Sequence, residues 1–188
     1  MTDKVNETKK TKNTKQTNFI KKWSLTCFAV LLLIVSLFII NVYAKTEVDN
    51  SAILYLTNKE RSALGLNTLT HSKVLDKAAY NKAKDIFNNQ YFDHVSPEGK
   101  TPWQFINEAG YDYSYAGENL AINFNELEST HEAWMKSPSH RANIVSPKYQ
   151  EIGYATVTGQ YKGETTTVTV EMFGTTMFDT VINQMSPW

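Results

Sequence analysis

An unbroken apolar run constrains this sequence more than any other feature. Residues 25–42 read LTCFAVLLLIVSLFIINV and contain no charged side chain. As a helix, this run would extend about 27 Å, close to the thickness of the hydrocarbon core of a bilayer. A helix of a globular core is a poor alternative, because a segment without a polar face has to be buried on every side. We therefore predict that residues 23–44 form a membrane-targeting segment.

The charge before this segment gives it a direction. Residues 1–44 hold seven lysines and two acidic side chains, and all seven lysines precede the apolar run. The positive-inside rule then keeps residues 1–22 in the cytoplasm, as a basic arm too polar to bury a core and expected to be disordered. Two interpretations remain open: an uncleaved signal anchor, favoured by the length of the run, and a signal peptide cleaved after Ala44. In the first the protein stays in the cell membrane, in the second it is secreted, and both place residues 45–188 outside the cytoplasm.

The exported part is expected to be one domain. After a polar tether at 45–50, residues 51–178 are long enough to bury a core of their own, and 179–188 remain as a C-terminal tail. Residues 45–188 carry 12 basic and 17 acidic side chains, an acidic balance that argues against nucleic-acid binding. Cys27 is the only cysteine in the sequence, so no disulfide can form within the chain.

Capping residues and apolar spacing predict a mixed fold. Helices are expected at 51–64, from Ser72 onward, at 101–109, at 126–136 and from Ser137 to His140. Strands are expected at 151–157 and 165–173, which are rich in β-branched and aromatic residues, with Gly159 and Gly163 between them. The threonine-rich stretch 165–170 is expected to be half exposed. We predict an α+β fold, in which helices flank a small, mostly antiparallel sheet.

Four sequence blocks, in order, carry a family resemblance. They are YFDHVSPEG at 91–99, GENLA at 117–121, WMKSPSHRANI at 134–144 and YQEIG at 149–153. Together with NKER at 58–61, these blocks are similar to the CAP superfamily, also called SCP-like, in its bacterial form without cysteines. The resemblance covers about residues 51–176 and implies an α-β-α sandwich.

The resemblance also implies a cleft. His94 and His140 match the two histidines that line the family cavity, and Glu118 matches the first of its two acids. Ser137 stands three residues after the helix tryptophan, where the eukaryotic pattern has the second acid, so the full set of four is incomplete. Asn143 would add a polar wall. His94 and His140 are thus candidate ligands for zinc or another divalent metal, although the sequence establishes no cofactor.

The roles of these side chains stay open at this point. Glu118 can orient an imidazole, act as a general base and so be the candidate catalytic residue, or fasten a loop through backbone amides. Ser137 can line the cleft or only cap a helix. The pair His131-Glu132 is not a zinc-protease motif, because Met135 stands where a second histidine would be needed. The aromatic residues between 103 and 115 are expected to pack in the core, with the rim of a ligand groove as the alternative.

We predict an exported binding or interaction module that acts at the cell envelope or outside the cell. Its ligand would be an envelope component, a peptide, a lipid or a protein. A metal-dependent hydrolase of peptides or cell-wall polymers is the first alternative, with His94 and His140 as ligands and Glu118 as the base. A lipid-binding carrier is the second. The residues assign no catalytic reaction.

Overall fold

A four-stranded sheet organises most of the described chain. The computed structural model describes residues 30–35, 52–124 and 126–185, with the side chains of 182–185 left out. The chain divides into two compact units, Met1–Val48 and Asp49–Trp188. Both clusters of buried apolar side chains belong to the second unit.

Little of the first unit is described. Residues 30–35 are helical. The rest of the predicted targeting segment at 23–44 lies outside the described residues, as do the basic arm, Cys27 and the tether. Within the described ranges, no helix is both long and apolar enough to cross a membrane. The signal anchor and the cleaved signal peptide both stay predictions.

The strands of the sheet follow the order β1-β3-β4-β2. Strand β1 (Thr70–His71) pairs in parallel with β3 (Glu151–Tyr161). Strand β4 (Glu164–Thr176) lies between β3 and β2 (Tyr113–Ile122) and is antiparallel to both. The turn that joins β3 to β4 contains residues 162–163, which both have positive φ. The sheet is therefore mostly antiparallel, as predicted.

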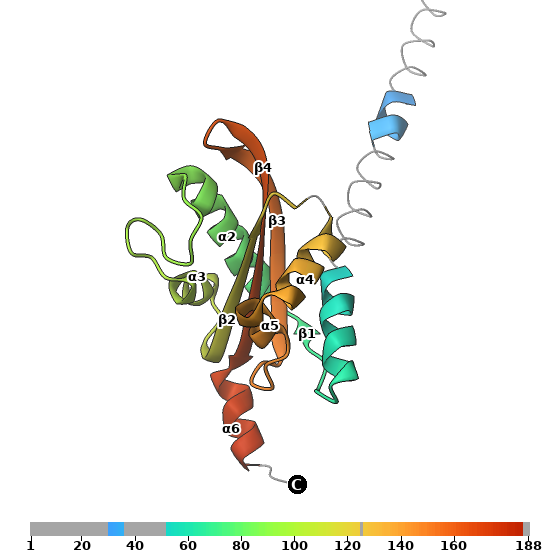
Figure 1. The fold of residues 1–188 in the computed structure, drawn as a ribbon, viewed down its shortest axis with the longest axis vertical. Coiled ribbons are helices and arrows are strands. Elements are labelled where there is room, and N and C mark those ends of the chain that lie inside the picture. The colour runs from blue at the N-terminus through green and yellow to red at the C-terminus, as the bar shows by residue number, and fades with distance from the viewer. Residues whose placement is uncertain (1–29, 36–51, 125, 186–188) are drawn as a thin grey trace, which may run out of the picture. The chain divides into compact units, whose positions relative to one another are not determined.

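Helices cover both faces of the sheet, which gives three layers (Figure 1). Helices α2 (Lys73–Asn89) and α3 (Pro102–Ala109) lie on one face. The helix over residues 52–63 lies on the other, together with α4 (Leu127–Lys136) and α5 (Pro138–Ile144). The predicted α-β-α sandwich is confirmed.

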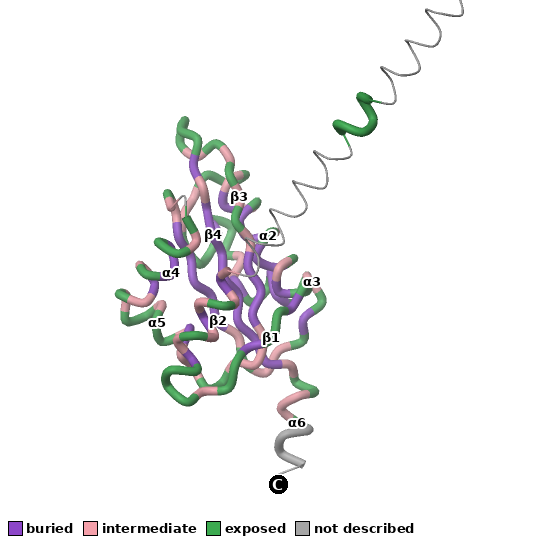
Figure 2. Tube along the Cα trace, turned by 90° about the vertical axis from the view of Figure 1, so that its right-hand side faces the viewer, coloured by how far each residue is buried: buried purple, intermediate pink, exposed green. Residues whose placement is uncertain are grey.

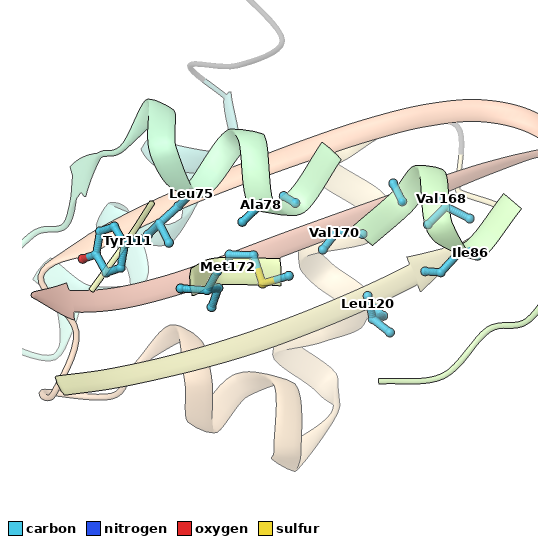
Figure 3. Packing of buried hydrophobic residues seen from close by; sticks show 11 residues of the cluster. Leu75, Ala78, Ile86, Tyr111, Leu120, Val168, Val170 and Met172 are labelled. Atoms are coloured by element: carbon cyan, nitrogen blue, oxygen red, sulfur yellow. The ribbon is translucent and has the colours of Figure 1, made fainter. Parts of the chain in front are cut away.

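Two apolar clusters join these layers, one on each face of the sheet. Buried residues run along β4 between the two helical layers (Figure 2). In the first cluster, side chains of α2 meet those of β2 and β4 (Figure 3); it includes Leu75, Ala78, Ile86, Leu120, Val168, Val170 and Met172. The second cluster lies under the helix over residues 52–63, α4 and α5; it includes Ile53, Trp134, Ile144, Ile152 and Phe173.

Helix α2 has the amphipathic pattern that the sequence predicts, with one polar addition. Its buried residues are Leu75, Ala78, Ala79, Lys82, Ala83 and Ile86. Ser72 stands at the N-cap, but its side chain makes no capping bond. Instead, its amide donates to the carbonyl of Ile152 at 2.8 Å, which extends the pairing of β1 with β3. Helix α2 lies so close to β3 that a Cβ on Gly153 would strike its backbone.

Of the two short helices before the hairpin, α5 differs from its prediction, because it continues to Ile144 rather than ending at His140. Helix α4 follows its predicted range and buries Thr130, His131 and Trp134. These three positions share one helical face.

Three predictions about the strands are corrected. Strand β2 was not expected, because its centre, Gly117 to Asn119, has low strand propensity; its pairing with β4 outweighs that preference. The threonines of β4 are not simply half exposed, because helices cover both faces of this central strand and Thr169 is 2% exposed. Gly159 belongs to β3 rather than to the turn, and the ring of Phe87 packs where its Cβ would lie.

The chain continues into α6 (Met177–Met185). The domain boundary predicted at residue 178 therefore falls inside a helix. The amide of Met177 donates to the carbonyl of Asp112 at 3.1 Å, which joins the start of α6 to the residue before β2.

Candidate functional site

The predicted site residues come from separate parts of the domain. His94 lies in the loop between α2 and α3, Glu118 lies on β2, and Ser137 joins α4 to α5, which carries His140 and Asn143. His94 hydrogen-bonds to Glu118, and His140 to Ser137. Asn143 bonds to the backbone of Glu118. These bonds form two groups, His94–Glu118–Asn143 and His140–Ser137, and Asn119 connects them through the carbonyl of His140 and the amide of Asn143.

The closest contact of the site joins His94 to Glu118. Nδ1 of His94 lies 2.6 Å from Oε1 of Glu118. The histidine side chain is 53% exposed, whereas the glutamate side chain is 1% exposed. A carboxylate only accepts hydrogen bonds, so Nδ1 carries the proton and Nε2 is left for other contacts. Of the alternatives for Glu118, this geometry matches the orientation of an imidazole; its carboxylate does not fasten a loop through backbone amides.

Burial and this hydrogen bond shift the protonation of both partners. The hydrogen bond to Glu118 raises the pKa of His94, although burial of the ring works against it. Burial raises the pKa of Glu118, although His94 and the charge of Lys82 oppose that rise. The second carboxylate oxygen, Oε2, is buried and has no hydrogen-bond partner among the described residues. The pair therefore holds a proton more tightly than either group would alone.

A buried lysine fixes the loop that carries His94. Nζ of Lys82 donates to the carbonyl oxygens of Asp93 and His94, at 2.9 and 2.7 Å, and to the hydroxyl of Tyr91 at 3.0 Å. Burial lowers the pKa of Lys82. The sequence alone did not identify Lys82 as a functional residue. The one clue to it is a lysine among the regularly spaced apolar positions of α2.

His140 differs from His94 in its protonation. Nδ1 of His140 lies 2.9 Å from Oγ of Ser137. Burial lowers the pKa of His140, and the positive charge of His94 lowers it further. Ser137 stands at the N-cap of α5 as predicted, but its hydroxyl makes no capping bond. The serine that stands where the eukaryotic pattern has an acid therefore contacts the second histidine.

Polar side chains also tie β2 to α5. Nδ2 of Asn143 donates to the carbonyl of Glu118 and to Oδ1 of Asn119. Asn119 in turn donates to the carbonyl of His140 at 3.2 Å and to Oε2 of Glu171 at 2.9 Å. Glu171 is fully buried, and burial raises its pKa to about 8. Sequence reasoning missed Glu171, whose signal was an acid between apolar residues of a predicted strand.

Other residues considered from the sequence lie elsewhere. His131 is buried on α4, and neither ring nitrogen has a hydrogen-bond partner among the described residues. The aromatic stretch divides: Phe105 and Tyr111 are buried in the core as predicted, while Trp103 and Tyr115 are partly exposed.

The described residues do not make a metal site. Zinc in proteins takes three or four nitrogen, sulfur or oxygen ligands from side chains. Within the described ranges, no group of three or more His, Cys, Asp or Glu side chains is placed to hold a metal ion. Metal binding by His94 and His140 stays a prediction, and no chemical step is derived from it.

Comparison with known proteins identifies the family. The model of the cysteine-rich secretory protein family, CAP, matches residues 54–173, a range that contains every site residue described above. The chain belongs to the CAP family. The predicted resemblance is therefore confirmed.

The CAP domain has relatives in Bacillus subtilis. The chain is 39% identical to the protein YkwD over 101 residues, which cover 54% of this chain and 39% of YkwD. It is 32% identical to the membrane protein YlbC over 101 residues, which cover 54% of this chain and 29% of YlbC. The chain thus spans less than half the length of these two relatives.

Solved structures show the same CAP architecture. An outer surface protein from Borrelia burgdorferi superposes with a TM-score of 0.60 at 26% identity, over 70% of this chain and 95% of that one. An extracellular protein with an SCP domain from Bacillus anthracis superposes with a TM-score of 0.59 at 25% identity, over 68% of this chain and 40% of that one. These two bacterial relatives are thus an outer surface protein and an extracellular protein.

Proposed function

We propose that this CAP protein is an exported binding module that acts at the cell envelope or outside the cell. It engages its ligand through the cleft residues His94, Glu118, Ser137, His140 and Asn143. The observation that carries the proposal is the half-exposed His94 ring, held through Nδ1 at 2.6 Å by the buried carboxylate of Glu118, while the hydroxyl of Ser137 holds Nδ1 of His140.

This arrangement suits recognition of a polar ligand. His94 is half exposed and held through Nδ1, so its Nε2–H can donate a charge-assisted hydrogen bond to an anionic or carbonyl oxygen. His140 is held through its own Nδ1, and burial and the charge of His94 lower its pKa, which favours the neutral ring. Two imidazoles fixed in this way present a charged donor and a neutral ring to one ligand.

Two observations support a place outside the cytoplasm. The relatives include an extracellular protein, an outer surface protein and a membrane protein. The lysine-rich arm and the apolar run at 25–42 give this chain the sequence of an exported protein. We propose anchorage in the membrane through residues 23–44, with secretion after cleavage at Ala44 as the alternative.

The hydrolase alternative needs Glu118 to activate a water molecule. Its carboxylate is almost completely buried, and Oε1 already bonds to His94. The geometry therefore favours a glutamate that positions an imidazole over one that acts as a general base. The lipid-carrier alternative gains no support from the described residues.

Cosedimentation with isolated cell-wall sacculi tests the proposal. The full chain, in neutral detergent, should pellet with the sacculi and release no soluble fragments. The His94→Ala/His140→Ala double variant should stay in the supernatant, while Lys84→Ala, a change on the exposed side of α2, should pellet as the unaltered protein does.

Three results would contradict this proposal. Equal pelleting of the double variant would exclude the cleft, and failure of the unaltered protein to pellet would exclude a ligand in the cell wall. Release of soluble fragments, abolished by chelation and by Glu118→Gln, would establish the hydrolase instead.

A further inference from the structure

A hollow lies along α5, on the side of the helix away from His140 and Asn143. It has a volume of about 600 Å³, and we call it the α4–α5 groove; its lining is Met135, Lys136, Pro138, Arg141, Ala142, Val145, Ser146 and Pro147. Four of these residues, at 138, 141, 142 and 145, follow the spacing of one helical face. His140 and Asn143 lie on the opposite face. The groove residues and the candidate-site residues of α5 therefore lie on opposite faces of this helix.

The charge of this region is opposite to that of the exported part as a whole. Residues 45–188 carry 12 basic and 17 acidic side chains. Between Glu132 and Glu151, however, the sequence has no acidic residue and contains Lys136, Arg141 and Lys148. The lining of the α4–α5 groove thus contains two cationic side chains and no acidic one, which favours an anionic ligand.

The cations at the groove are available to a ligand. Within the described residues, the exposed guanidinium of Arg141 has neither an ion-pair partner nor a hydrogen-bond acceptor. Lys136 lies 3.6 Å from Glu132, but both side chains are more than 70% exposed, so this pair is weak. A guanidinium binds carboxylates through two parallel hydrogen bonds, which makes Arg141 the natural anchor.

We propose that the α4–α5 groove binds a peptide segment in which a carboxylate stands next to an apolar side chain. Arg141 would bind the carboxylate, supported by Lys136. The apolar side chain would pack against Met135, Val145 and Pro147. This site is separate from the cleft and does not depend on the function proposed for the cleft.

The shape and charge of the groove favour a peptide over other anionic partners. Binding of a polyphosphate polymer gains strength with each phosphate neutralised, and this groove has only two cations in its lining. Binding to a lipid surface needs apolar side chains that protrude, whereas these line a hollow. One cation beside an apolar floor fits a carboxylate beside an apolar side chain.

Fluorescence anisotropy of a labelled peptide tests the proposal. The probe is a rhodamine-labelled hexapeptide of alternating leucine and glutamate, titrated with the full chain in neutral detergent. We expect saturable binding that weakens with added salt, and none to the matching leucine–lysine peptide. Arg141→Glu should raise the dissociation constant about tenfold or more, whereas Lys84→Glu, which makes the same change in net charge on α2, should raise it less than about twofold.

A second variant addresses the floor of the groove. Ala142→Phe keeps every charge but fills the hollow, so it should weaken binding several-fold, with the circular dichroism spectrum unchanged. The proposal is overturned if the unaltered protein binds neither peptide, or if Arg141→Glu and Lys84→Glu weaken binding equally. It is also overturned if His94→Ala/His140→Ala abolishes binding while Ala142→Phe does not, because the peptide would then occupy the cleft.

Discussion

Replacing Glu171 with glutamine is expected to stabilise the domain, and to do so more strongly as the pH rises. The Glu171 carboxyl is fully buried, between Asn119 Nδ2 at 2.9 Å and the hydroxyl of Thr57 at 3.4 Å. Burial raises its pKa from 4.5 to about 8. Since the unfolded chain ionises near 4.5, the folded protein binds one more proton than the unfolded chain between these values.

The sign and the size of the effect follow from this difference. A raised carboxyl pKa leaves stability intact below pH 4.5 and reduces it progressively as the pH rises toward 8. At 1.36 kcal/mol for each pH unit, the loss is about 3 kcal/mol at pH 7 and about 5 kcal/mol above pH 8. Glutamine has the shape of the protonated acid, and its amide can keep both partners. Glu171→Gln should therefore regain about 3 kcal/mol at pH 7 and nothing at pH 4.

Urea unfolding at several pH values, followed by circular dichroism, measures this difference. The control is Glu164→Gln, which removes an exposed carboxylate at the start of the same strand and should change the free energy of unfolding by less than about 0.5 kcal/mol at any pH. A Glu171→Gln effect that does not change between pH 4 and pH 8 would refute the reasoning. So would a loss of stability at pH 7.

Four further changes have expected outcomes. Glu118→Gln removes the hydrogen-bonded charge beside His94, so the His94 ring, followed by NMR, should titrate at lower pH. His94→Ala should raise the pKa of His140, because it removes a positive charge that lowers that pKa. If neither histidine changes its titration in these variants, the coupling of His94 to Glu118 and His140 is contradicted. Gly153→Ala places a methyl group against the backbone of α2 and should cost about 3 kcal/mol in urea unfolding; a cost below about 1 kcal/mol would show that the helix can move away. Arg61→Met should cost about 2–4 kcal/mol by the same assay, because its guanidinium donates to the carbonyls of Ile144, at the end of α5, and of Ser146. An unchanged unfolding midpoint would show that water replaces the guanidinium.

Local signals in the sequence were sufficient for most of the helices and for the last two strands, but not for α6 or for the last turn of α5. Thr101 and Gln104 form the capping box that starts α3, and Gly110, with φ of 102°, follows its end. Such signals depend on a few neighbouring residues, so the sequence carries them directly. Strand β2 could not be predicted in the same way, because Gly117 and Asn119 favour turns and only the ladder with β4 makes them extended.

For the candidate site, too, the sequence identifies some of the residues, but only the folded chain shows their contacts. The sequence blocks identify His94, Glu118 and His140, but not which of them touch. The direct contact of His94 with Glu118 depends on the placement of a loop over β2. Lys82 and Glu171 were missed because each is a charged residue within an apolar pattern, and only the folded chain shows what a buried charge bonds to. Tertiary contacts therefore decide the protonation states on which the proposed binding depends.

The central claim is that His94, as a cation held by Glu118, binds the ligand. The most direct test measures the fraction of protein bound to isolated sacculi as a function of pH. Because the pKa of His94 is raised, the cation persists above the ordinary histidine range and is lost as the pH rises further. We predict that binding falls along this titration, that Glu118→Gln moves the fall to lower pH, and that His94→Ala does not bind. Binding that is independent of pH and survives His94→Ala would contradict the claim.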